Sequence, residues 1–300
     1  MEQAAVSTPA SARLTFPVLL RALRPYEWVK NSFVYAALLF SGQFDLDSAL
    51  KATGAFAAFC AVASAGYLVN DIVDVELDRR HPAKRFRAIA SGALAIPAAR
   101  GVAIALALAG LLIALVVSPA VCGMVAAYGA LTLAYSFALK RMVIIDVMAI
   151  AGCFLLRVLT GAVAIDVKAS PWLLVCTGMV SLFLGFTKRR QEAVLEMGSQ
   201  FGARPVLEHY SLPFLDQMIA MVTAAAIISY VIYTVDSPRV GSKMLATAPS
   251  VLYGIFRYLY LIYDRRDTRS TAAILTEDPG MIFAAVTWVG TALLMLYVVN

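Results

Sequence analysis

The chain has 300 residues, of which 61% are hydrophobic and only 15% are charged. Soluble domains are closer to half apolar and a quarter charged, so this composition excludes a soluble globular protein and indicates one that lies in a lipid bilayer. The net charge of +6 at pH 7 does not imply nucleic acid as a partner, because membrane proteins gather lysine and arginine in their cytoplasmic loops.

The N-terminal segment is rich in alanine, serine and threonine and has no apolar core like that of a signal peptide. We expect residues 1–15 to form a disordered cytoplasmic tail and residues 16–300 to form a single transmembrane domain.

About nine apolar stretches follow, each close to the length that crosses the hydrocarbon core. They cover residues 29–43, 49–69, 94–117, 120–139, 143–165, 171–187, 215–235, 245–263 and 281–299. The first is short and begins among charges, which is typical of a tilted or partly interfacial segment. Because the stretches lack strand alternation, we predict an all-α polytopic bundle of about nine transmembrane helices.

The positive residues predict the orientation of this bundle. With the N-terminus inside, nearly every lysine and arginine falls on the cytoplasmic side, and the other side receives only Lys51, Lys168, Arg239 and Lys243. The C-terminus is then outside. The longer connections, residues 70–93 and 188–214, both lie on the cytoplasmic face, where we expect the functional site.

The segment from Gly66 to Asp78 continues the second apolar stretch without a helix breaker, so we expect it to extend that helix out of the membrane. One amide and three carboxylates, spaced by three or four residues, share one broad face of such a helix, and Glu76 points elsewhere. These predicted metal ligands are Asn70, Asp71, Asp74 and Asp78.

Carboxylates stacked in this way repel one another unless a cation binds. Mg²⁺ prefers oxygen ligands and keeps several positions for water or phosphate oxygens. The alternative is a solvated acidic helix end paired with Arg79 and Arg80. Because ionisable groups beside a membrane span are costly, we favour a Mg²⁺ site that holds a diphosphate.

A basic loop follows directly, with Arg79, Arg80, Lys84, Arg85 and Arg87 close to the last aspartate. A metal-loaded carboxylate row beside a basic loop is suited to a phosphorylated substrate. The general excess of lysine and arginine in cytoplasmic loops explains how many basic residues this loop has. It does not explain why they lie beside the aspartates.

The segment NDIVDVELDRRHPAKRFRAIASG resembles the NDxxDxxxD segment of the UbiA superfamily of intramembrane prenyltransferases. Within it, the chain most resembles the decaprenyl-phosphate phosphoribosyltransferase branch, from residue 24 to about 192. The matching segments are RPYEWVKNSFVYAALLFSG at 24–42, DRRHPAKRFRAIASG at 78–92, YSFALK at 135–140, FLLRVLTGAVA at 154–164 and FTKRRQE at 186–192.

This resemblance implies nine transmembrane helices and a Mg²⁺-diphosphate site that faces the cytoplasm from the plasma membrane. It implies transfer of a 5-phosphoribosyl group from 5-phosphoribosyl 1-diphosphate to a polyprenyl phosphate, with release of diphosphate, for cell-envelope glycan precursors. The length of the lipid tail and the formation of a homo-oligomer stay open.

One departure from the prenyl-transferring members of the superfamily bears on the donor. Those members typically carry a second aspartate pair after the fourth span, whereas here Asp146 is followed four residues later by Ile150. One aspartate motif plus basic residues suits a donor with one metal-bound diphosphate and a separate monophosphate. The alternatives are a prenyltransferase that acts on an aromatic acceptor and a non-catalytic transporter or lipid-binding protein.

The resemblance also implies individual roles. Arg157 lies mid-span, on the helix face of Asp146, and is expected to face a phosphate; a structural ion pair is the alternative. Lys30 is expected to bind substrate, and an interfacial anchor beside Trp28 is the alternative. The loop up to Pro213 is expected to fold over the site. The predicted catalytic residues are Asp74, Asp78 and Asp146. The predicted substrate-binding residues are Lys30, Asn70, Arg79, Lys84, Arg85, Arg87, Tyr135, Lys140, Arg157, Lys188, Arg189 and Glu192.

Overall fold

The computed structural model describes residues 15–43, 45–82, 84–196, 206–236, 241–267, 269 and 271–297. These residues form helices joined by turns and contain no strand, so the predicted all-α fold is confirmed. The predicted N-terminal tail lies outside them except for Thr15.

Eight helices of the described chain are long and apolar enough to cross a membrane. They coincide with the second to ninth predicted stretches, so the chain is a multi-pass membrane protein. Their bounds are α3 Leu46–Val73, α5 Ile96–Val117, α6 Pro119–Phe137, α7 Ile145–Ala164, α8 Pro171–Glu196, α9 Leu212–Val235, α10 Ala248–Tyr263 with the preceding turn η5 Gly241–Thr247, and α12 Pro279–Tyr297.

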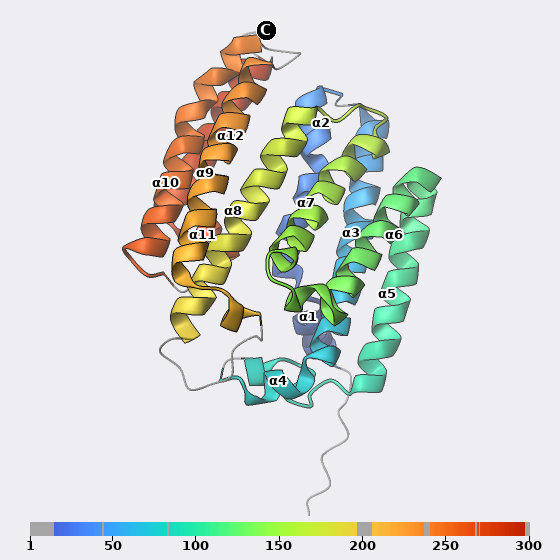
Figure 1. The fold of residues 1–300 in the computed structure, drawn as a ribbon. Coiled ribbons are helices and arrows are strands. Elements are labelled where there is room, and N and C mark those ends of the chain that lie inside the picture. Colours follow the sequence, from blue (N-terminus) through green and yellow to red (C-terminus); the bar gives the residue numbers. More distant parts are fainter. Residues whose placement is uncertain are drawn as a thin grey trace, which may run out of the picture.

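The first predicted stretch, residues 29–43, is not one long helix: it falls on the end of the 3₁₀ helix η1 (Pro25–Tyr35) and on α2 (Ala36–Ser41). Together with α1 (Phe16–Leu23), which precedes η1, these elements form a broken first segment. Figure 1 shows α1 and α2 at opposite ends of the bundle, so this segment also passes from one end to the other. The break falls at Arg24, which has a left-handed backbone (φ 53°, ψ 59°) and precedes a proline.

The spans differ in how deeply they are buried. In the most apolar part of α3, 61% of the residues are buried, against 17% in α5. Helix α3 is therefore central, whereas α5 lies at the edge of the bundle and exposes apolar side chains suited to lipid (Figure 1).

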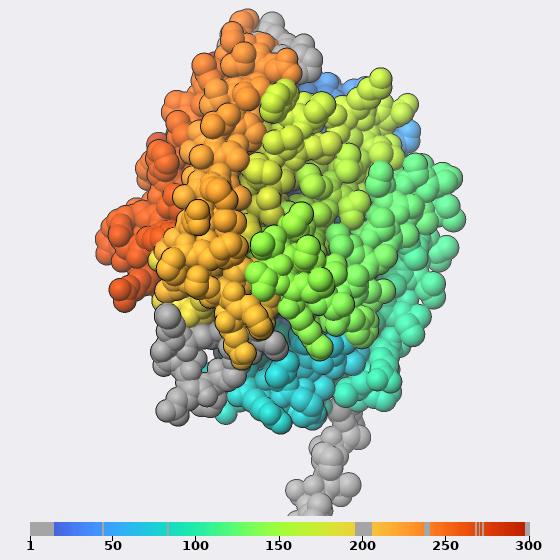
Figure 2. Space-filling view, in the orientation of Figure 1, coloured from blue at the N-terminus to red at the C-terminus, as the bar shows by residue number. Residues whose placement is uncertain are grey.

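The prediction that the second span continues as one unbroken helix to Asp78 is wrong at Asp74. Helix α3 ends at Val73, Asp74 has non-helical angles (φ −93°, ψ 7°), and the short helix α4 (Val75–Arg80) follows. Figure 1 shows α4 lying across the end of the bundle, and Figure 2 shows this end covered by α4 and the residues after it (cyan). Backbone hydrogen bonds from Asp74 to Asn70 and from Asp78 to Asp74 nevertheless keep nearly helical spacing along the row.

The two long connections are shorter than predicted because helices occupy part of each. Helix α8 continues to Glu196, so the FTKRRQE segment is helical, and the turn η4 (Leu207–His209) precedes α9. Of the predicted lid, residues 197–205 lie outside the described residues. The remaining short elements are η2 Lys84–Phe86, η3 Leu139–Arg141 and α11 Thr271–Glu277.

Candidate active site

The oxygen ligands of the aspartate row converge in pairs rather than on one point. Nζ of Lys140 contacts Asp74 at 2.5 Å and Asn70 at 3.3 Å. Nη1 of Arg87 contacts Asp78 at 2.7 Å and Asp71 at 3.2 Å. Among the described residues, no three His, Cys, Asp or Glu side chains are grouped closely enough to hold a metal. The predicted four-ligand cluster is therefore arranged here as two pairs, each directed at a positive charge.

Arg24 joins this row although the sequence reasoning did not select it. Its guanidinium donates to both oxygens of Asp71, at 2.6 and 2.8 Å, and lies 5.3 Å from the ring centroid of Tyr67. The left-handed backbone that breaks the first segment directs Arg24 to this place, and such strained residues cluster at functional sites. The sequence signal was available, because Arg24 is the first residue of the matched segment RPYEWVKN.

The donor set fits a magnesium ion. Mg²⁺ is usually held by one or two carboxylates together with water and substrate phosphate oxygens, and each pair supplies two oxygen ligands. The two oxygens of each pair lie within 2.5–3.3 Å of one cationic nitrogen, so they are close enough together to bind a single cation.

Asp146 lies at a second centre and is fully buried. Its two oxygens are both occupied: Nε of Arg189 donates to Oδ2 at 2.6 Å, and the hydroxyl of Tyr210 donates to Oδ1 at 2.7 Å. Arg189, only 1% exposed, uses its other nitrogens to bind Glu192 at 2.6 Å and the hydroxyl of Tyr135 at 3.1 Å. Asp146 thus holds Arg189, and Arg189 in turn holds Glu192 and Tyr135, which are less deeply buried.

Tyr210 is a second residue that sequence reasoning missed. Its hydroxyl also accepts the backbone N–H of Ile144 at 2.7 Å, just before Asp146 in the chain. Burial and the hydrogen bond to Asp146 raise the pKa of Tyr210, so the phenol keeps its proton and donates a hydrogen bond to the carboxylate. Tyr210 falls beyond the matched segments, and no sequence signal singled it out.

The broken first segment brings further charges to the same end of the bundle. Lys30 forms an ion pair with Glu27, and both Lys188 of α8 and Arg24 lie close enough to interact electrostatically with Glu27. Two predicted residues, Lys30 and Lys188, are thereby associated through an acidic residue that was not predicted.

Arg157 is buried in the interior and does not pair with Asp146, so the ion-pair alternative for these two residues is wrong. Its guanidinium donates to Asn31 at 2.8 Å, to the Cys153 carbonyl at 3.0 Å and to the Tyr128 hydroxyl at 3.1 Å. Three aromatic rings lie 4.8–5.8 Å away and add cation–π contacts, from Phe59, Tyr128 and Phe154.

The remaining residues of the basic loop lie nearer the surface. Arg79 pairs with Glu76 at 2.7 Å, which agrees with the prediction that Glu76 points away from the row. Arg85 is exposed and stacks on Phe86, and the N–H of Lys84 donates to His81 at 3.2 Å. Of the predicted basic loop, Arg87 is the residue that these contacts join to the aspartates.

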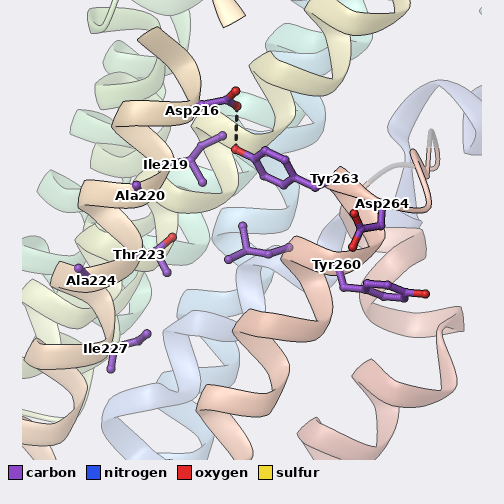
Figure 3. Close-up of a pocket in the computed structure, with 10 residues that line it drawn as sticks. Asp216, Ile219, Ala220, Thr223, Ala224, Ile227, Tyr260, Tyr263 and Asp264 are labelled. Carbon is purple, nitrogen blue, oxygen red and sulfur yellow. Dashed lines mark hydrogen bonds between the residues drawn. The ribbon is translucent and has the colours of Figure 1, made fainter. Parts of the chain in front are cut away.

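A cavity of about 580 Å³ lies elsewhere, between α9 and α10 (Figure 3). Asp216 and Tyr263 share a hydrogen bond of 2.7 Å at one end of it, and Thr223 lines it farther along. No predicted site residue is among its lining residues, so the cavity is separate from the site described above.

Comparison with known proteins gives matches over most of the chain. Residues 31–192 match the UbiA prenyltransferase family. The chain is 33% identical to a decaprenyl-phosphate phosphoribosyltransferase of Corynebacterium glutamicum over 93% of this chain and 87% of that protein. It is 37% identical to the protein of the same name from Mycolicibacterium smegmatis, over 77% of this chain and 74% of that one.

The fold is similar to that of a UbiA homologue from Archaeoglobus fulgidus, whose structure was solved with GPP and Mg²⁺ bound. The TM-score is 0.72 at 16% identity, and the match covers 94% of this chain and all of the other. At this identity the likeness concerns the fold alone.

Proposed function

Because the chain belongs to the UbiA prenyltransferase family, we propose that it transfers a 5-phosphoribosyl group from 5-phosphoribosyl 1-diphosphate to decaprenyl phosphate or a related polyprenyl phosphate. Diphosphate is the leaving group. The names of the two bacterial relatives support this reaction, since the chain matches each of them over most of its length.

The observation that carries the choice of donor is the burial of Asp146. The family resemblance implies that prenyl-transferring members typically have a second aspartate pair at this place. Here both oxygens of the single carboxylate are taken by Arg189 and Tyr210. Only one carboxylate row is left to hold a metal-bound diphosphate. That asymmetry favours a donor with one diphosphate and a separate monophosphate over a prenyl diphosphate.

The aspartate row would hold Mg²⁺, through Asp74 and Asn70 on one side and Asp71 and Asp78 on the other. When bound, the ion would neutralise charge that develops on the departing diphosphate. The pairing of these oxygens with Lys140 and Arg87 supports such a role, because each pair already faces a positive charge.

The basic residues would bind the phosphate groups of the donor. Lys140, Arg87 and Arg24 adjoin the aspartates, and Lys188 and Lys30 adjoin Glu27 at the same end of the bundle. Held in this way, the donor loses its C1–O bond to diphosphate, and the electron pair leaves with the diphosphate. The lipid phosphate, already anionic, forms the new bond to C1 without a strong general base. Positioning and electrostatic stabilisation supply most of the rate.

We place this site on the cytoplasmic face of the plasma membrane, on the strength of the positive residues that gather at the α4 end. We further assign the product to the synthesis of cell-envelope glycan precursors, as the resemblance to the phosphoribosyltransferase branch implies. The isoprenoid tail of the acceptor would lie among the apolar spans.

The reaction is tested with purified protein in lipid nanodiscs, Mg²⁺, radiolabelled 5-phosphoribosyl 1-diphosphate and decaprenyl phosphate. We expect a labelled product that extracts into organic solvent, that requires the lipid phosphate and that disappears when EDTA removes the metal. No such product, together with prenyl transfer from a prenyl diphosphate to an aromatic acceptor, would contradict the proposal and support the prenyltransferase alternative.

A further inference from the structure

Tyr210 lies beyond the segments that carry the family resemblance, yet its hydroxyl makes two hydrogen bonds to the start of α7. We infer that Tyr210 is a positioning residue: it holds the backbone turn at Ile144 and thereby fixes the Asp146–Arg189 pair at the donor site. The inference rests on the proposed phosphoribosyl transfer for its kinetic consequences, but its structural part can be tested without any substrate.

The turn that Tyr210 holds is strained. Ile144 has φ 69° and ψ −48°, and the N–H of Ile145 donates to the Val143 carbonyl at 2.8 Å, which closes a γ-turn of the rare positive-φ type. For a β-branched residue this backbone is unfavourable and persists only when neighbouring groups hold it. The hydroxyl of Tyr210 is such a group, because it accepts the N–H of Ile144 at 2.7 Å.

Tyr210 is itself held firmly by the residues around it. Val206 and Leu207, just before it, are 0% and 5% exposed and belong to the hydrophobic core, and the Tyr210 ring packs on Phe214. Ser211 caps the first turn of α9 by accepting the N–H of Phe214 at 3.3 Å. The hydroxyl is therefore placed by the docking of residues 206–211 and α9, far along the chain from α7.

The effect passes from Tyr210 to the site through Asp146 and Arg189. The buried carboxylate cannot reach a substrate while both its oxygens are occupied, so it acts by orienting Arg189. Arg189 in turn holds Glu192 and Tyr135, two of the predicted substrate-binding residues. Without the Tyr210 hydroxyl, one oxygen of Asp146 and the N–H of Ile144 would both lose their partner inside the protein, which is costly.

The kinetic test replaces Tyr210 by phenylalanine, which keeps the ring and removes only the hydroxyl. We expect the KM for 5-phosphoribosyl 1-diphosphate to rise about tenfold or more, with the KM for decaprenyl phosphate unchanged. A merely structural role would reduce the fraction of active protein and so lower kcat with both KM values unchanged. Tyr263→Phe is the matched control, because Tyr263 also donates to an aspartate at 2.7 Å but lies outside the site.

Two further measurements test whether Tyr210 holds the turn at Ile144. Hydrogen exchange of the Ile144–Met148 amides should be about tenfold faster in Tyr210→Phe than in the wild type or in Tyr263→Phe. Ile144→Gly should restore part of the donor affinity to Tyr210→Phe, because glycine adopts φ 69° without strain.

Unchanged exchange in Tyr210→Phe would overturn the inference, whatever reaction the protein catalyses. A donor KM equal to that of the wild type, or a double variant no better than Tyr210→Phe, would overturn it as well. A wild-type protein without phosphoribosyl transfer would instead contradict the proposed function, and the exchange measurement would then decide the positioning role by itself.

Discussion

At the scale of single residues, each acidic group of the site is matched by a particular basic group. Asp74 contacts Lys140, Asp71 contacts Arg24, and Asp146 contacts Arg189, all at 2.5–2.6 Å. Buried or partly buried charges are stable only when they are paired in this way. The pairing offsets the cost of burying these carboxylates at a membrane interface.

Asp74 is the residue on which we expect the reaction to depend most. Asp74→Asn removes one negative ligand and should reduce turnover about 100-fold or more, since electrostatic stabilisation of the leaving group is a large part of catalysis. Membrane insertion and the unfolding temperature in detergent should change little, because asparagine has nearly the same shape.

Glu76→Gln is the matched control, since Glu76 lies two residues away, is exposed and pairs with Arg79 rather than with the row. It should retain wild-type turnover in the product assay. Full activity of Asp74→Asn would show that the metal site is assigned to the wrong residues.

At the scale of elements, the broken first segment is what the site depends on. It brings Arg24 to the aspartates and Asn31 to Arg157, which a straight helix of the same residues would not do. Its 3₁₀ backbone packs directly on α7, where a Cβ added to Gly161 would lie 1.9 Å from the carbonyl oxygen of Val34. Glycine is required there because no side chain fits between the two backbones.

Gly161→Ala should therefore destabilise the protein, by about 1–3 kcal/mol or more, as overpacking of a close contact does. We expect a lower unfolding temperature in detergent and a lower yield of folded protein. Gly123→Ala, in α6, is the control, because a Cβ there meets no atom within 4 Å. Equal unfolding temperatures for the two variants would contradict the described contact between α7 and η1.

At the scale of the whole molecule, the helices cross the bundle in alternating directions. As a result, α1 and α4 lie at one end of the bundle and the end of α12 lies at the other (Figure 1). Basic residues gather at the α4 end, next to the site. The proposed donor is a charged, water-soluble metabolite, so we expect the site to face the compartment in which that donor is made.

The orientation is tested with fusions to the full chain. A green fluorescent protein at the N-terminus should be fluorescent in a bacterial host, and an alkaline phosphatase at the C-terminus should be active, because the latter folds only outside the cytoplasm. An inactive phosphatase, with fluorescence from a C-terminal fluorescent protein, would reverse the predicted topology.

The amino-acid sequence by itself determined the spans and the composition of the site. Span positions follow from hydrophobicity along consecutive residues, so eight of the predicted stretches match described helices. The aspartate row was visible for the same reason: its members lie within nine residues of each other, and their spacing holds even though the helix bends at Asp74. The family followed from segments such as RPYEWVKN and FTKRRQE, which are also local.

The tertiary structure alone decided which charges meet. Asp71 and Arg24 are 47 residues apart, Asp74 and Lys140 are 66 apart, and Asp146 and Tyr210 are 64 apart. No periodicity or spacing rule reaches so far, because such pairs form only when separate helices pack. For the same reason the sequence placed Arg157 near Asp146, on one helix face, whereas packing directs Arg157 to Asn31 of the broken segment and Asp146 to Arg189 of α8.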